Sequence, residues 1–279
     1  MIQGSGLRAA SHFGGDGVKL HKAAARLAGW ELQHIRKDQP TLETHLSQLL
    51  PKLGIDCLLD VGANQGQYGS MLRRSGYKGR IVSFEPVKAS FDILRAKAAK
   101  DPQWSVYNYA LGATAGESMI HVSRSTVMAS FLDATEFSHE QFPEGMQVTR
   151  DEKVTIQTLD AVFSLVTEGL KSPRVFLKMD TQGYDLQVFA GAKRSLPQVR
   201  GLQTEISIQA IYEGMPDYLE SLATYTKAGF VMTGLYPVSR DKRTLALIEL
   251  DCVMRRSEKL RERAVAAPTK KARKKRKKS

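Results

Sequence analysis

The chain has 279 residues, of which 42% are hydrophobic and 25% are charged. This composition suits one packed domain with extensions, and it excludes a chain that is disordered throughout. The 41 basic and 29 acidic residues give a net charge of +12, but eight of the basic residues lie among the last ten, Lys270 to Ser279. The rest of the chain therefore has a charge balance that is ordinary for a soluble enzyme.

The cysteines and the lengths of the apolar stretches indicate in which cellular compartment the protein is expected. Cys57 and Cys252 each lie inside an apolar run, which predicts buried free thiols in a reducing compartment. No stretch reaches the roughly 20 apolar residues that cross a bilayer, and the first residues lack the apolar core of a signal peptide. We therefore expect a cytoplasmic protein without a transmembrane segment.

Both ends of the chain differ from its middle. Helical spacing of apolar residues predicts helices over Val18–Lys37 and Thr41–Leu50, the second with Thr41 as its N-cap. The last residues are a basic Ala-Pro-Lys-Arg segment with nothing to bury, so we expect disorder there. The predicted parts are an N-terminal helical extension over 1–53, the main domain over 54–256 and a basic disordered tail over 257–279.

The main domain alternates between strands and helices. The predicted strands are Cys57–Val61, Arg80–Phe84, Trp104–Tyr109, Val154–Leu159, Val175–Met179, Leu202–Ile206, Phe230–Leu235 and Leu245–Met254. Helical patterns separate most of them, which predicts an α/β fold with a mostly parallel sheet and helices on both faces. Only a loop joins the last two strands, so we expect the final strand to be antiparallel. Two stretches of the long insertion after the third strand are predicted to form a mobile lid, Ser123-Arg124-Ser125-Thr126 and Phe142-Pro143-Glu144-Gly145.

A glycine-containing loop follows the first predicted strand, over Asp60–Gly66. Glycines there permit a tight turn and close approach of a ligand to the backbone. A dinucleotide fingerprint would need glycine at 62, 64 and 67, but Asn64 and Gln67 stand at two of these positions, which argues against NAD. Glu85 ends the next strand, where an acid accepts hydrogen bonds from ribose hydroxyls. The two signals together predict an adenosine-type ligand.

Four motifs follow one another along the chain: Leu59-Asp60-Val61-Gly62-Ala63-Asn64-Gln65-Gly66, Phe84-Glu85-Pro86, Asn108-Tyr109-Ala110-Leu111-Gly112 and Lys178-Met179-Asp180-Thr181-Gln182-Gly183-Tyr184. Together they resemble the FkbM family of S-adenosylmethionine-dependent methyltransferases, over about Asp56 to Met254. The resemblance implies the class I methyltransferase fold, a Rossmann-like sheet with an antiparallel last strand. It also implies S-adenosyl-L-methionine as the cofactor.

The resemblance assigns roles on the cofactor side. The loop from Gly62 through Asn64 to Gly66 would wrap the methionyl part, with Asp60 near its ammonium group. Glu85 would hold the ribose. Asn108 is either a contact to adenine or a turn residue, and the two interpretations stand equal.

Lys178 and Asp180 carry the argument on the acceptor side, because they lie at the end of a strand where open parallel sheets bind ligands. We expect Asp180 to be the general base or to anchor the acceptor, with Lys178 steadying the oxyanion or pairing with the acid. The alternative is an internal ion pair, since residues two apart on a strand point the same way. Many related sequences have Glu where this chain has Gln182, so no carboxylate is available there.

Other residues leave alternatives open. Glu205 could join Asp180 as a metal ligand, although a hydrogen-bonded buried acid is the preferred interpretation and we predict no metal site. His121 or His139 in the insertion could act as the base instead.

We expect a methyltransferase that acts on a hydroxyl of a sugar, a glycan precursor or a secondary metabolite, a substrate class that comes from the resemblance alone. One alternative is an RNA methyltransferase that uses the basic tail, but the expected Asn-Pro-Pro-Tyr-like or cysteine motif is missing. Another is a non-catalytic cofactor-binding module. The tail itself is expected to make nonspecific contacts with nucleic acid or an anionic surface.

Overall fold

A seven-stranded sheet organises the chain in the computed structural model, which describes residues 40–257. Its strands are β1 (Cys57–Val61), β2 (Arg80–Phe84), β3 (Trp104–Tyr107), β7 (Val175–Met179), β8 (Val199–Ser207), β9 (Phe230–Arg240) and β10 (Leu247–Arg256). They lie in the order β3-β2-β1-β7-β8-β10-β9. Only β10 runs against its neighbours β8 and β9, so the predicted mostly parallel sheet with an antiparallel last strand is confirmed. The predictions for Val18–Lys37 and for the basic tail from residue 258 onward lie outside the described residues.

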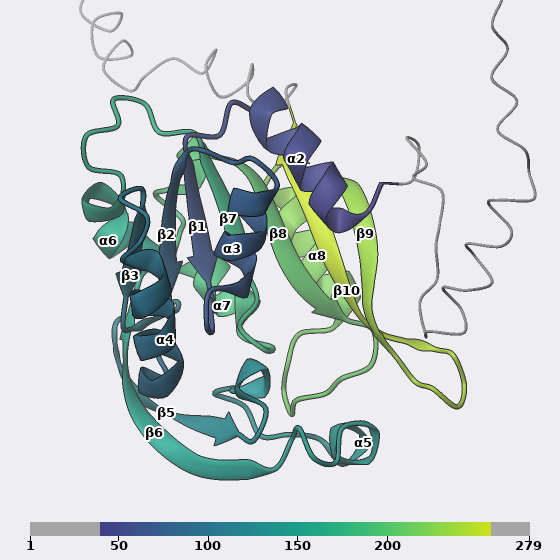
Figure 1. Ribbon diagram of the computed structural model, residues 1–279. Helices are drawn as coiled ribbons and strands as arrows, with labels where there is room; N and C mark the ends of the chain where they lie inside the picture. Colours follow the sequence, from purple (N-terminus) through teal and green to yellow (C-terminus); the bar gives the residue numbers. More distant parts are fainter. Residues whose placement is uncertain (1–39, 258–279) are drawn as a thin grey trace, which may run out of the picture. The chain divides into compact units, whose positions relative to one another are not determined.

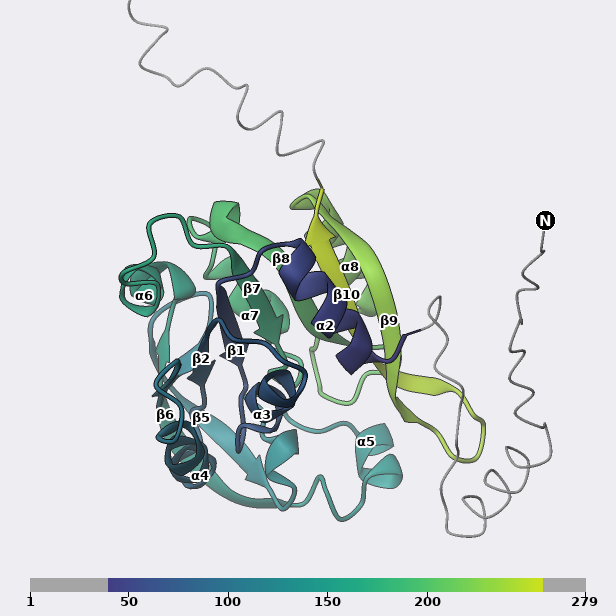
Figure 2. The same cartoon turned by 45° about the horizontal axis from the view of Figure 1, so that its top comes forward.

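Helices cover both faces of this sheet, as Figures 1 and 2 show. One face packs against α6 (Leu159–Val166), α7 (Asp185–Ala190) and α8 (Tyr218–Lys227), and the other against α2 (Leu42–Lys52), α3 (Gln67–Arg74) and α4 (Lys88–Ala98). Because side chains alternate along a strand, successive β1 residues join the two cores in turn. Within residues 40–257, no helix is long and apolar enough to cross a membrane.

Helix α2 belongs with the sheet by its packing. Thr41 caps it as predicted, accepting a hydrogen bond from the Thr44 backbone N–H at 3.3 Å. Leu46 is fully buried and shares a core with Leu58 of β1 and Phe176 of β7. The domain bounds predicted from the sequence place this helix in an extension over 1–53. We instead propose that the folded unit begins at α2, since burial of its apolar stripe stabilises helix and sheet together.

The insertion between β3 and β7 forms its own three-stranded sheet. It contains β4 (Ala110–Leu111), β5 (Gly116–Ser123), η1 (Thr126–Met128), α5 (Glu136–Gln141) and β6 (Val148–Gln157), with the strands in the order β4-β6-β5. The predicted strand Val154–Leu159 is therefore shifted, because Thr158 caps α6 by accepting from the Ala161 N–H. Figure 1 shows β5 and β6 below the large sheet, where β1 and β2 point.

The strand order reverses between β1 and β7. From β1 the chain adds β2 and β3 on one side, and it later returns to add β7 and β8 on the other. In open parallel sheets, ligands bind at the carboxyl ends of the strands beside such a reversal. The fold therefore points to the end of β1 as the place to look for a site.

Candidate active site

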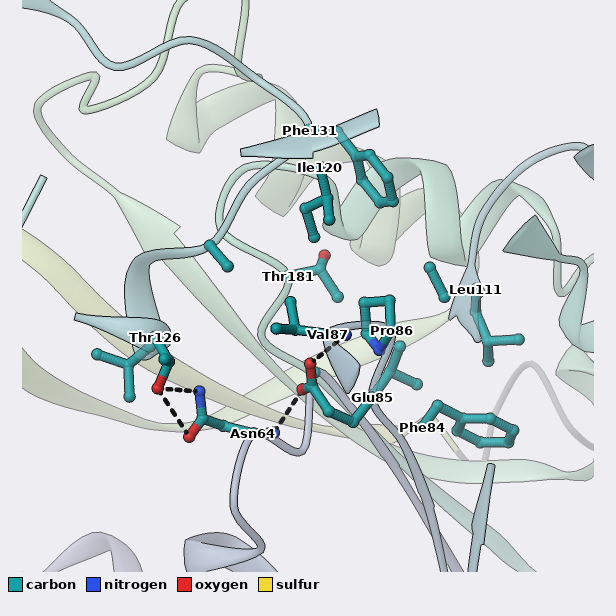
Figure 3. Close-up of a pocket in the computed structure, with 15 residues that line it drawn as sticks. Asn64, Phe84, Glu85, Pro86, Val87, Leu111, Ile120, Thr126, Phe131 and Thr181 are labelled. Carbon is teal, nitrogen blue, oxygen red and sulfur yellow. Dashed lines mark hydrogen bonds between the residues drawn. The ribbon is translucent and has the colours of Figure 1, made fainter. Parts of the chain in front are cut away.

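A cavity of about 520 Å³ lies at the carboxyl ends of β1 and β2, under the insertion. Gly62, Phe84 and Glu85 line it from the large sheet and the loops that follow it, while Leu111, Ile120 and Phe131 line it from the insertion. Figure 3 shows the Glu85 carboxylate among largely apolar side chains. An apolar cavity around one acid is suited to a ligand with a flat ring and hydroxyl groups.

Glu85 is held in place by backbone groups. Its Oε2 accepts from the Asn64 N–H at 2.7 Å, and its Oε1 accepts from the Val87 N–H at 2.8 Å. Burial raises the pKa of Glu85 to about 7, although these two N–H groups and the Lys178 ammonium favour the charged form. A carboxylate has about four acceptor positions, so capacity remains for hydroxyl donors from the cavity.

The loop between β1 and α3 has a backbone that few sequences can adopt. Gly62 has φ +75°, and a Cβ added there would lie 1.9 Å from the Asp180 carbonyl oxygen. Asn64 has φ +46°, a conformation that asparagine tolerates better than most residues. Its amide donates to the Thr126 hydroxyl at 3.2 Å, which ties the loop to the insertion across one edge of the cavity (Figure 3).

Lys178 forms a buried charged centre behind this loop. Its Nζ lies 3.1 Å from Asp60 Oδ1 and 3.4 Å from Asp180 Oδ2, and it donates to the Gly62 carbonyl at 3.0 Å. Burial alone would lower the pKa of Lys178, but the two carboxylates outweigh it and raise the pKa above its ordinary value. The ammonium therefore stays charged and holds together the ends of β1 and β7.

Gln182 joins two acids on the other side of Asp180. Its Nε2 donates to Asp180 Oδ1 at 3.2 Å and to Glu205 Oε2 at 2.8 Å, and its Oε1 accepts from the Tyr212 hydroxyl at 2.8 Å. Burial, and then the charges of Asp180 and Glu249, raise the pKa of Glu205 well above its ordinary range. The Asp180 side chain remains 37% exposed. Among the described residues, no group of three or more His, Cys, Asp and Glu side chains has a geometry that could hold a metal ion.

Residues 60–232 match the methyltransferase FkbM domain model, more than half of the chain. The chain belongs to the FkbM methyltransferase family. It is 26% identical over 185 residues to the 2-O-methyltransferase NoeI of Sinorhizobium fredii, and 24% identical over 178 residues to the hexuronic acid methyltransferase AglP of Haloferax volcanii. The alignments cover 64% and 63% of this chain, and 75% and 65% of those relatives.

A solved FkbM methyltransferase from Methylobacillus flagellatus is also similar to this chain. The two share 14% sequence identity with a TM-score of 0.42, over 71% of this chain and 43% of the other. The assignment of the chain as a methyltransferase enzyme with the class I α/β fold rests on the family match and on the strand order described above.

Only some of the residues predicted to bind the cofactor of this FkbM methyltransferase line the cavity. Gly62, Asn64 and Glu85 line the cavity, whereas Asp60 is fully buried behind it, paired with Lys178. Gly66 begins α3 with φ +79°, and a Cβ there would press on Leu94 and Trp104. These two residues are therefore placed to support the loop.

Asn108 also braces a loop. Its amide donates to the backbone carbonyls of Glu85 and Pro86, both at 2.9 Å, and the residue is exposed and does not line the cavity. This placement agrees with the second of the two interpretations, a turn residue.

The four sequence motifs do not include the residues that close the cavity from the insertion. Ile120, Thr126, Val127 and Phe131 come from a segment without a recognisable motif. The only signal was the alternation of Ile120 and Val122 with polar neighbours, which fits a strand with one buried face. Thr181, which does lie in a motif, also lines the cavity.

Proposed function

We propose that this FkbM methyltransferase uses S-adenosyl-L-methionine and transfers its methyl group to a hydroxyl of a sugar. The observation that carries the cofactor assignment is the buried Glu85 carboxylate at the end of β2, inside a cavity at the strand-order reversal. An acid at this place in a Rossmann-like sheet holds a ribose through its hydroxyls.

The remaining walls fit the other parts of the cofactor. Val87, Leu111 and Ile120 offer an apolar slot for the adenine ring. The backbone at Gly62 and Asn64 offers a turn without bulky side chains for the methionyl part. The carboxylate, the apolar walls and the loop backbone together therefore suit an adenosine that carries an amino-acid chain. A dinucleotide fits less well, because the loop lacks two glycines of the dinucleotide fingerprint.

When bound, S-adenosyl-L-methionine supplies an electrophilic methyl group on a positively charged sulfur. Asp180, whose side chain is 37% exposed at the end of β7, would accept the proton of the acceptor hydroxyl and so leave its oxygen ready to take that methyl group. Proton removal by a positioned base contributes about 10²–10⁴-fold. Lys178 acts as a positioning residue, because its ammonium binds Asp180, Asp60 and the loop carbonyl of Gly62.

The substrate class rests on the relatives, whose printed names are a 2-O-methyltransferase and a hexuronic acid methyltransferase. Both names describe methyl transfer, and the second names a sugar acid. No observation within residues 40–257 favours RNA, and the basic tail lies beyond them. We therefore place a sugar or glycan before RNA as the acceptor.

The test is transfer of a labelled methyl group from S-adenosyl-L-methionine to separate pools of glycosides, lipids and RNA by the full chain. We expect label in the glycoside pool. Label in the RNA pool alone would favour the RNA alternative. Binding of S-adenosylhomocysteine without label in any pool would favour a non-catalytic cofactor-binding module.

A further inference from the structure

A second cavity, of about 440 Å³, lies within the insertion beside Tyr212. It is lined by groups of two kinds. His121, Asp133 and His139 present polar side chains, and Met128, Leu132 and Met146 are prominent among its apolar ones. Cavities with an apolar wall and a few convergent polar groups are the usual form of small-molecule sites. The cofactor cavity does not include any of these residues.

One segment of chain, residues 126–132, is the wall between the two cavities. Alternate residues face opposite sides: Val127, Ala129 and Phe131 line the cofactor cavity, while Met128, Ser130 and Leu132 line the second. The segment runs from the 3-10 helix η1 through the bridge residue Ser130, and this single stretch serves both cavities. A ligand in the second cavity would therefore lie next to the cofactor.

Two hydrogen bonds connect the lining of the second cavity to the loop after β7. The Ser130 hydroxyl donates to the Gln182 carbonyl at 2.7 Å, and the buried Tyr212, which lines the second cavity, donates to Gln182 Oε1 at 2.8 Å. Gln182 in turn donates to Asp180. The second cavity therefore lies two hydrogen bonds away from the proposed base.

The charges around the cavity select among ligands. His121 Nδ1 lies 2.7 Å from Asp151 Oδ1, and its Nε2 lies 3.5 Å from Asp133 Oδ1. The Asp133 side chain is 83% exposed, so its carboxylate can accept further hydrogen bonds. Carboxylate and imidazole groups bind hydroxyls well, but two acids in one place repel an anionic ligand.

We infer that the second cavity is the acceptor site and that it takes the ring of an uncharged sugar beside Tyr212, whose hydroxyl leads through Gln182 to Asp180. The apolar C–H face of the ring packs on Met128 and Leu132, and the Asp133 carboxylate accepts from ring hydroxyls. This inference rests on the proposed function for the transfer step, but the binding of the sugar is measured independently of it.

The experiment is saturation-transfer NMR on the full chain with two probes, methyl β-D-glucopyranoside and methyl β-D-glucuronide, with and without S-adenosylhomocysteine. The blocking variant is Val148→Trp, since Val148 lines the cavity and is 48% exposed, which leaves room for the larger ring in the fold. The matched control is Val238→Trp on β9, where Val238 is 49% exposed and lines neither cavity.

We expect wild type and Val238→Trp to saturate the glucoside and Val148→Trp to lose the signal. The glucuronide should bind about tenfold more weakly, and Asp133→Asn should weaken the glucoside and remove this preference. Equal signals for wild type and Val148→Trp, absence of signal with both probes, or preference for the glucuronide would overturn the inference. Glycoside methylation by both wild type and Val148→Trp would also overturn it and leave the proposed function standing. Sugar binding without any S-adenosylhomocysteine binding would overturn the proposed function and leave the sugar site standing.

Discussion

The two halves of the sheet edge hold their acidic side chains in different ways. On the β1–β2 side, one carboxylate, Glu85, lies in an apolar cavity and is oriented by backbone N–H groups. On the β7–β8 side, Lys178, Asp180, Gln182 and Glu205 orient one another through their side chains. The first arrangement depends on the backbone of a loop, and the second on a network in which each charge needs its partners. Substitutions should therefore have local effects on the first side and spreading effects on the second.

The largest effect on stability should come from Lys178→Met. Removing the ammonium leaves the buried Asp60 carboxylate without its cation, which costs about 3–5 kcal/mol of the free energy of unfolding. The control is Lys88→Met, because Lys88 pairs with Asp92 on the surface and is 58% exposed. Urea denaturation should show a large loss for the first variant and almost none for the second. Equal losses would mean that the buried pair has no special role.

The next effect concerns the backbone that joins the two halves. Gly62→Ala would place a Cβ 1.9 Å from the Asp180 carbonyl oxygen. Gly76 also has a positive φ, but the Cβ of Gly76→Ala would have nothing within 4 Å. Strain alone costs about 1 kcal/mol, and backbone overlap raises the cost to about 3 kcal/mol. Thermal unfolding of the two variants separates these contributions. A similar fall in melting temperature for both variants would show that the contact between position 62 and the Asp180 carbonyl does not add to the cost.

A smaller, purely functional effect should follow from Asp180→Asn. The substitution keeps the shape and removes the base, so turnover should fall about a hundredfold while S-adenosylhomocysteine affinity stays the same. Labelled-methyl transfer measures the first quantity and calorimetry the second. Near-normal turnover would end the assignment of Asp180 and move attention to His121 and His139, which line the second cavity.

The smallest predicted effect is the pH dependence of cofactor affinity. The pKa of Glu85 is raised to about 7, so the carboxylate takes up a proton as the pH falls through neutrality and loses acceptor capacity for ribose hydroxyls. S-adenosylhomocysteine affinity should fall about tenfold from pH 8 to pH 6. In Glu85→Gln the affinity should be lower and should not change with pH over this range. A wild-type profile as flat as that of the variant would contradict the shifted pKa.

The two halves also differ in what the sequence predicts. The bounds of β1, β2 and β7 match the predicted strands residue for residue, because short apolar runs bounded by glycines and acids leave little freedom. Gly62, Asn64 and Glu85 line the cavity because adjacent parallel strands end at one edge. The Gln182 bridge was not predicted, since it depends on Glu205 and Tyr212, which are distant in the chain and meet only through the fold.

The insertion was the least predictable part. The sequence predicts no strand over β5 or the start of β6, because Ile120 and Val122 are the only buried apolar residues of β5. Exposed two-stranded pairs have weak sequence signals. The residues of the insertion that line the two cavities could therefore be identified only from the structure.

The most direct test of the cofactor site is calorimetry with S-adenosylhomocysteine on wild type, Glu85→Gln and Glu168→Gln. Glu168 is exposed at the end of α6 and lines neither cavity, so its variant controls for the loss of a charge. We predict binding by wild type and Glu168→Gln, and binding at least about tenfold weaker by Glu85→Gln. Equal affinity in all three proteins, or binding of NAD in place of S-adenosylhomocysteine, would contradict a cofactor held by Glu85 at the end of β2.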